Sequence, residues 1–185
     1  MLATDFVYEF IKHPSRVGTL TQSSRFLARA IAQQINGSSH VIEFGPGMGA
    51  VTTEILKRLP AHGRLTCFEI NPCFCHYLSR INDPRLRIIN DDARNCEKYV
   101  HNLDCIVSGL PLVLLNKSAR EEILAISRKS KRFIQLQYSP VLAETVKTYF
   151  SDVKVSFTLL NFPPAFVYVC TSPQPRVAGK IRSLH

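Results

Sequence analysis

The chain has 185 residues, 45% of them hydrophobic, which is enough for one domain with a buried core and leaves little room for a second. It contains no apolar run long enough to cross a bilayer and no signal-peptide pattern at its N-terminus, so we expect a cytoplasmic protein. The formal net charge of +9 predicts an anionic partner, either a nucleic acid or the anionic surface of a membrane.

Two helices are predicted ahead of the first strand. Leu2, Phe6 and Phe10 recur at helical spacing in an amphipathic segment, whose apolar face fits the protein's own core or a membrane surface equally well. The segment SSRFLARA follows, and we expect Ser23 and Ser24 to cap the N-terminus of its helix.

A glycine-rich turn after the first strand is the strongest signal in the chain. The stretch VIEFGPGMG is an apolar strand with Glu43 near its end, followed by Gly45, Gly47 and Gly49. Glycine lets the backbone turn sharply and approach a ligand, and the amides that open the next helix, predicted over 51–59, face the same ligand. The turn also satisfies the dinucleotide fingerprint G-x-G-x-x-G/A, so by itself it predicts a nucleotide-type ligand without naming it.

Strands and helices alternate through the rest of the chain. Further strands are predicted over 65–70, 86–90, 103–111, 132–139, 153–160 and 165–172. Helices are predicted over 74–81, 95–101, 118–129 and 140–150, with Ser118 and Glu121 as a capping box. Repeated βα units predict an α/β fold with a mostly parallel seven-stranded sheet, an antiparallel end around the turn NFPP, and helices on both faces. Such sheets bind ligands at the carboxyl ends of their strands.

The six cysteines show no C-x-x-C spacing, and Cys67, Cys105 and Cys170 lie inside apolar strand-like runs. We therefore expect reduced and mostly buried thiols. The group CFCH at 73–76 has metal-ligand chemistry, but no second ligand pair follows at a zinc-like spacing, so no metal is expected.

Acidic residues accompany three successive strand ends, at Glu43, Glu69 and Asp92, and SGLP follows the fourth strand. In this order they resemble the class I S-adenosylmethionine-dependent methyltransferases, a Rossmann-like fold, over nearly the whole chain. The resemblance implies that the glycine loop approaches the methionine part of the cofactor, that Glu69 accepts hydrogen bonds from the ribose hydroxyls, and that Asp92 with Ala93 contacts the adenine amino group. The full set of cofactor-binding residues it implies is Ser24, Glu43, Gly45, Gly47, Gly49, Glu69, Ile70, Asp92, Ala93 and Ser108. An NAD-dependent oxidoreductase has only the fingerprint in its favour.

Residues 108–112 separate two subfamilies that both resemble the chain. Ribosomal RNA adenine dimethylases carry Asn-(Leu/Ile)-Pro-(Tyr/Phe) here, where the Asn holds the target amine and the aromatic ring stacks on the base. In this chain Gly109 lacks the amide and Leu112 cannot stack. SGLPL resembles instead the bacterial phospholipid N-methyltransferases, as do IKHPSRVGTLTQSSRFLARA and NFPPAFVYV. That resemblance implies attachment of the N-terminal helix to an anionic membrane, with a peripheral position at the inner membrane face.

The predicted reaction is therefore methyl transfer to the amine of phosphatidylethanolamine, with RNA adenine N6-methylation as the alternative and a domain that has lost catalysis as a third interpretation. Ser108 and Tyr138 are the polar side chains expected near the methyl group, with the carbonyls of Gly109 and Leu110 as amine acceptors. Arg16 and Arg25 are candidates for the lipid phosphate. The expected organisation is two N-terminal helices over 1–36, a cofactor-binding catalytic domain over 37–173 and a flexible basic tail over 174–185.

Overall fold

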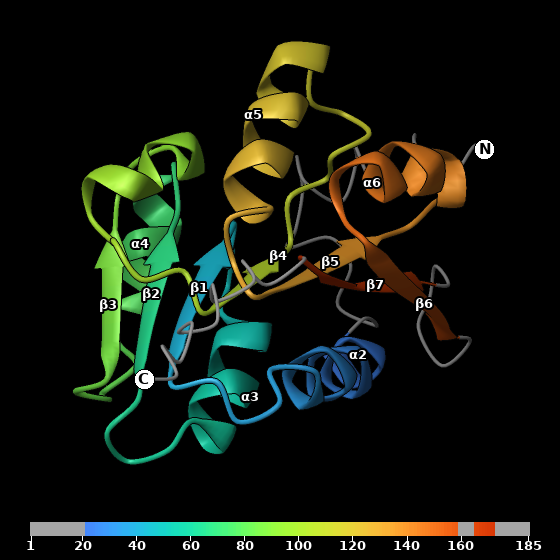
Figure 1. Ribbon diagram of the computed structural model, residues 1–185. Helices are drawn as coiled ribbons and strands as arrows, with labels where there is room; N and C mark the ends of the chain where they lie inside the picture. Colours follow the sequence, from blue (N-terminus) through green and yellow to red (C-terminus); the bar gives the residue numbers. More distant parts are fainter. Residues whose placement is uncertain (1–20, 159–164, 173–185) are drawn as a thin grey trace, which may run out of the picture.

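A single sheet organises the molecule (Figure 1). The computed structural model describes residues 21–158 and 165–172, and within these ranges seven strands lie in the order β3-β2-β1-β4-β5-β7-β6. The first five strands are parallel, and β7 runs antiparallel between β5 and β6. The predicted mostly parallel sheet with an antiparallel end is thus confirmed. The strands are β1 (His40–Phe44), β2 (Arg64–Phe68), β3 (Leu86–Ile89), β4 (Cys105–Ser108), β5 (Arg132–Gln137), β6 (Asp152–Thr158) and β7 (Ala165–Thr171).

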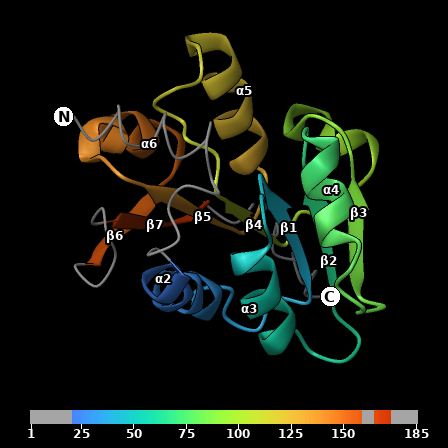
Figure 2. The same ribbon diagram turned by 180° about the vertical axis from the view of Figure 1, so that it is seen from behind.

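Helices cover both faces of this sheet, as the two opposite views show (Figures 1 and 2). One face packs against α5 (Lys117–Ser127), α6 (Ala143–Tyr149) and the 3-10 helix η2 (Ala93–Lys98). The other face packs against α2 (Thr21–Gln33) and α3 (Ala50–Arg58). Two short helices, α4 (Pro72–Leu78) and η3 (Pro140–Leu142), complete the set in the described ranges.

Side-chain alternation along the strands builds a separate core on each face. On β1, Ile42 and Phe44 belong to the cluster that includes α5 and η2, whereas Val41 belongs to the cluster that includes α2 and α3. All these side chains are almost fully buried, as expected for a central parallel strand. Because the parallel strands end level with one another, Phe44, Phe68 and Ser108 share one register, and the loops that follow them meet at the carboxyl edge.

Two predicted helix caps differ from the structure. Helix α5 begins at Lys117, and its N-cap is Asn116, whose side chain accepts a hydrogen bond from the backbone amide of Ala119 at 2.8 Å. The predicted cap, Ser118, lies inside the first turn instead and bonds the Glu122 carboxylate, because the asparagine that precedes the helix already satisfies the free amides. Residues from Thr21 onward are helical in α2 (Thr21–Gln33), so Ser23 and Ser24 lie within the helix and not at its N-cap.

Several sequence predictions fall outside the described residues: the amphipathic helix with Leu2, Phe6 and Phe10, the turn NFPP, Arg16 and the basic tail. Within residues 21–158 and 165–172, no helix has the length and apolar character needed to cross a membrane. In the same ranges Cys67, Cys105 and Cys170 are buried free thiols, and no three metal-ligand side chains gather around one point.

Candidate active site

The glycine loop between β1 and α3 is shaped by three residues with positive φ. These angles are 67° at Gly45, 54° at Gly47 and 81° at Gly49, where L side chains are strained. A Cβ added at Gly45 would lie 2.8 Å from Leu110 Cδ2, and one at Gly49 would lie 2.7 Å from Leu78 Cδ2. A Cβ at Gly47 would meet nothing within 4 Å. Gly45 and Gly49 therefore pack against the protein, while Gly47 faces the open side, as a loop that approaches a ligand requires.

Glu69 follows β2 and lies beside this loop. Its Oε2 accepts a hydrogen bond from the amide of Gly47 at 3.1 Å, and its Oε1 accepts one from the amide of Asn71 at 2.9 Å. The residue is only 7% exposed. A carboxylate offers about four lone-pair sites, so each oxygen retains one for a further donor. The two remaining acceptor sites thus fit two neighbouring hydroxyl groups, which are the groups that the ribose of S-adenosylmethionine presents.

Glu43 occupies a different position from the other strand-end acids. Its side chain is buried, and its Oε2 accepts hydrogen bonds from the Thr52 hydroxyl at 2.7 Å and from the Cys67 thiol at 3.4 Å. Burial raises the pKa of the Glu43 carboxyl from 4.5 to about 7. These contacts tie β1 to α3 on either side of the glycine loop, so Glu43 positions the loop. Direct contact between Glu43 and a cofactor stays a prediction.

The raised pKa of Glu43 leads to a prediction about stability and pH. Below pH 4.5 this carboxyl is protonated in both states, but between pH 4.5 and 7 it ionises in the unfolded chain first, so the folded state loses stability as pH rises. The loss attributable to this group is about 3 kcal/mol by pH 8. Glu43→Gln removes the titration. Urea unfolding of both proteins at pH 4.5 and 8 should show a smaller fall in the free energy of unfolding for the variant; parallel changes in the two proteins would contradict the assignment.

Asp92 and Ala93 lie where β3 passes into η2. The Asp92 side chain caps η2 by accepting a hydrogen bond from the amide of Arg94 at 2.8 Å, and it pairs with the Arg94 guanidinium at the same distance. These bonds from Arg94 lower the pKa of the Asp92 carboxyl. Ala93 is buried against the core, and Ile70, after Glu69, is 70% exposed. The predicted adenine contacts of Asp92 and Ala93 stay predictions, with Asp92 already held in place by Arg94.

The loop after β4 is anchored to both neighbouring strands. Gly109 donates its amide to the carbonyl of Phe44 at 2.9 Å, and the buried Ser108 hydroxyl accepts a hydrogen bond from the Leu110 amide at 3.3 Å. The carbonyl of Leu110 accepts two hydrogen bonds, from the Leu112 amide and from Nε2 of Gln135, both at 2.9 Å. Both lone pairs of that carbonyl are therefore used. Of the two carbonyls predicted to accept an amine, that of Gly109 is the one left without such bonds in the described ranges.

Comparison with known proteins decides the family. The model of the ribosomal RNA adenine dimethylase family matches residues 22–128, more than half of the chain. The chain belongs to the ribosomal RNA adenine dimethylase family. It is accordingly a class I S-adenosylmethionine-dependent methyltransferase, with S-adenosylmethionine as its methyl donor. No curated protein matches the sequence.

Solved structures of other methyltransferases share the fold. A precorrin-6Y C5,15-methyltransferase from Geobacter metallireducens superposes with a TM-score of 0.66 at 13% identity, over 80% of this chain and 88% of that one. A 1,6-didemethyltoxoflavin-N1-methyltransferase from Burkholderia thailandensis gives 0.68 at 16% identity, over 93% and 87% of the two chains. The 23S rRNA methyltransferase ErmE gives 0.57 at 17% identity, over 84% and 71%.

This member of the dimethylase family departs from the family's motif after β4, and the structure shows that the departure is built into the packing. A Cβ at Gly109 would lie 2.9 Å from the backbone carbonyl oxygen of Gly45, so an asparagine does not fit there without a backbone shift. Leu112 stands where the family has a stacking ring, and its side chain is completely buried in the core against α5. Neither the amide nor the ring is supplied by these two positions.

Tyr138 lies at the end of β5 on the face of α2 and α3, where it packs against the core and burial raises the pKa of its phenol. Leu110 packs on the opposite face. The two residues thus pack against different core clusters, and a role for Tyr138 near the methyl group stays a prediction. Ser24 belongs to α2, and its contact with the cofactor also stays a prediction.

Gln135 was missed by the sequence analysis. It is a fully buried amide in the middle of β5, and its bond to the Leu110 carbonyl holds the loop that carries the acceptor motif. The signal that could have revealed it is a glutamine inside the otherwise apolar strand RFIQLQ, because a buried amide needs hydrogen-bond partners. Asn90 was also missed; its Nδ2 donates to the backbone carbonyl of Glu69 at 2.8 Å and so supports the residue that is predicted to bind the ribose.

Proposed function

We propose that this methyltransferase acts on the primary amine of an ethanolamine phospholipid. The observation that carries the proposal is the packing of the acceptor loop. At Gly109 there is no space for the amide that would hold an adenine, and the buried Leu112 offers no ring on which a base could stack. A flipped base is held by stacking and by hydrogen bonds to its edge, whereas a small aliphatic amine requires neither a ring nor a deep pocket.

Exposed apolar side chains around the carboxyl edge support a lipid acceptor. Met48 in the glycine loop is 52% exposed, Val141 after β5 is 72% exposed, and Phe157 near the end of β6 is 51% exposed. Leu114, after β4, is also exposed. These positions follow or end strands at the edge where the cofactor site opens. Exposed apolar side chains along one edge of a basic protein suit contact with an anionic membrane.

The chain's own residues contribute mainly by positioning. When bound, S-adenosylmethionine would supply a methyl group on a cationic sulfur. The amine, after its ammonium form has released a proton to solvent, would form the new C–N bond as the C–S bond breaks, leaving a thioether and a methylated ammonium. In this proposal Gly47 and Glu69 hold the donor, and the carbonyl of Gly109 accepts a hydrogen bond from the amine. An aliphatic ammonium has a pKa of roughly 10, so the apolar surroundings of Leu110 and Leu112 must favour its neutral form by desolvation. Alignment of the two reactants supplies the rest of the catalysis.

The second candidate is RNA adenine N6-methylation. The family assignment favours it over a lipid acceptor, and one protein of the same fold is named as a 23S rRNA methyltransferase. The net charge of +9 suits an RNA backbone as well as an anionic membrane. The two candidate functions differ in the methyl acceptor that must bind next to Gly109 and Leu112. An assay that identifies the methylated acceptor therefore distinguishes them.

The experiment offers each acceptor separately with S-adenosylmethionine labelled in its methyl group. Vesicles that contain phosphatidylethanolamine should become labelled, and unmethylated small-subunit ribosomal RNA should not. The variant Glu69→Gln, tested with the same two acceptors, supplies the background in each case. Label in RNA with none in lipid would overturn the proposal in favour of the second candidate, and label in neither would contradict both.

A further inference from the structure

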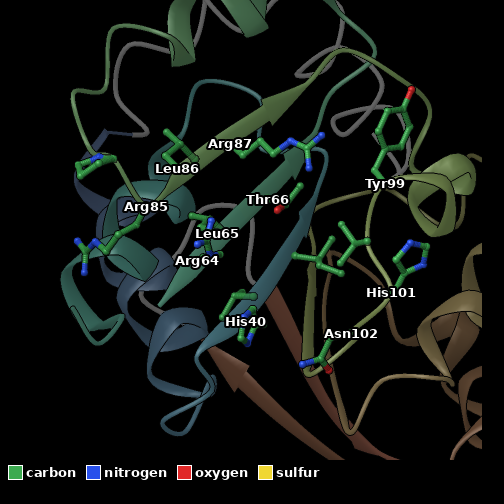
Figure 3. Close-up of a pocket in the computed structure, with 14 residues that line it drawn as sticks. His40, Arg64, Leu65, Thr66, Arg85, Leu86, Arg87, Tyr99, His101 and Asn102 are labelled. Carbon is green, nitrogen blue, oxygen red and sulfur yellow. The ribbon is translucent and has the colours of Figure 1, made fainter. Parts of the chain in front are cut away.

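A second concave site lies on the sheet away from the carboxyl edge (Figure 3). It encloses about 290 Å³ between the beginnings of β1, β2 and β3 and the loop 99–102. Its walls include His40, Arg64, Thr66, Arg87 and His101. The buried side chains of Phe44, Phe68 and Ile89 lie two residues further along the same face of these strands and separate the concavity from the glycine loop.

The concavity exists because the connection from β3 to β4 contains no α-helix. In its place an α/β fold ordinarily has an α-helix that covers the full length of the strands. Here the connection contains only η2, six residues of 3-10 helix, which spans roughly 12 Å. Ala93 and Cys96 of η2 pack near Phe68 and Ile89, toward the carboxyl ends of the strands. The earlier residues on that face, among them Thr66 and Arg87, are left without a covering helix.

The lining is basic, and it includes no aspartate or glutamate among its fourteen residues. Arg85 is held by structural contacts, because it pairs with Asp83 at 2.7 Å and donates to the carbonyl of Leu59 at the C-terminal end of α3. Arg64 and Arg87 are exposed and make no ion pair within the described ranges. They lie on adjacent strands, two guanidinium groups on one face that are free to bind an anion.

We propose that this concavity binds a small phosphorylated molecule, whose phosphate is held between Arg64 and Arg87. A guanidinium group matches the geometry of phosphate oxygens, and the hydroxyl of Thr66, on the same strand as Arg64, is a neutral donor in the same lining. Ile42 and Val100 add apolar side chains to the lining. The ring of Tyr99 forms one side for the organic part of the ligand. The volume is at the lower end for small-molecule sites, which favours a compact phosphoester over a polymer.

The proposal is independent of the methyl acceptor, and its test uses binding as the readout. The full chain labelled with ¹⁵N is titrated with inorganic phosphate and, separately, with glycerol 1-phosphate at about 0.1 M salt, where long-range charge effects are screened. Saturable shifts are expected at the amides of residues 64–66, 86–87 and 99–102, with the phosphoester binding more tightly than phosphate. The double variant Arg64→Gln/Arg87→Gln should weaken binding by about tenfold or more because it removes both charged donors.

The matched control is Arg80→Gln/Lys117→Gln, which removes the same charge from exposed positions outside the concavity and should bind as the parent does. S-adenosylmethionine affinity, measured in parallel, should be equal in all three proteins. Absence of saturable shifts, or equal affinity in the two double variants, would overturn the proposal. It would also be overturned if only single-stranded RNA, or only vesicles with phosphatidylglycerol, shifted these amides, since a macromolecule would then be the partner.

Discussion

Replacing Glu69 with glutamine is expected to lower the affinity for S-adenosylmethionine by about a hundredfold or more. Two hydroxyl donors to a carboxylate are each worth roughly 1.5–3 kcal/mol, and a neutral amide retains one acceptor oxygen at best. Its NH₂ group would moreover face the amide of Gly47 or Asn71, both of which now donate to Glu69. The same substitution should cost only about 1–2 kcal/mol of unfolding free energy, because the residue sits in a loop beyond the end of β2.

Isothermal titration with S-adenosylmethionine measures the affinity, and urea unfolding measures the stability. Glu97→Gln is the matched control: it makes the same chemical change at an exposed residue of η2 that pairs with Lys129. That control should bind the cofactor as the parent chain does. An affinity within threefold of the parent in Glu69→Gln would remove this residue from the site, whatever the methyl acceptor turns out to be.

Gly109→Ala is expected to destabilise the fold by about 1–3 kcal/mol and to weaken cofactor binding by about tenfold. The added Cβ would lie 2.9 Å from the carbonyl oxygen of Gly45, which is backbone and cannot rotate away. The two loops must therefore separate, and the one that moves carries the amide of Gly47 that bonds Glu69. The methyl group that alanine adds at Gly109 is therefore expected to disturb the cofactor site, because the loop after β4 is in direct contact with the glycine loop.

The control for this prediction is Gly37→Ala. Gly37 has a φ of 77° and open space where its Cβ would be, so alanine there introduces only backbone strain of about 1 kcal/mol. Thermal unfolding and cofactor titration of the two variants distinguish the effect of backbone strain, present in Gly37→Ala, from the effect of the close contact with Gly45 in Gly109→Ala. Normal cofactor affinity in Gly109→Ala would show that the loops do not press on each other as described.

Local patterns explain why much of the fold was predictable. Helical spacing from Val51 to Leu59 and the apolar runs of the strands depend on neighbours in the chain, and the structure confirms α3 and all seven strands within two or three residues at most ends. The cap of α5 was wrong because Ser118 and Asn116 are both good N-caps, and only the actual path of the backbone selects between them. The structure likewise brings Glu69 to the glycine loop, as the shared carboxyl edge of parallel strands required.

Short-range spacing was sufficient to predict the α/β architecture, the glycine loop and the order of the strand-end acids, because each depends on residues that are neighbours in the chain. The tertiary structure alone decided that Glu43 faces Thr52 inside the core, that Gln135 holds the acceptor loop, and that Gly109 touches Gly45. It also decided that Arg64 and Arg87 stand together on an uncovered face. These contacts join residues on different strands, and their partners are set by sheet register and side-chain direction, which no local pattern contains.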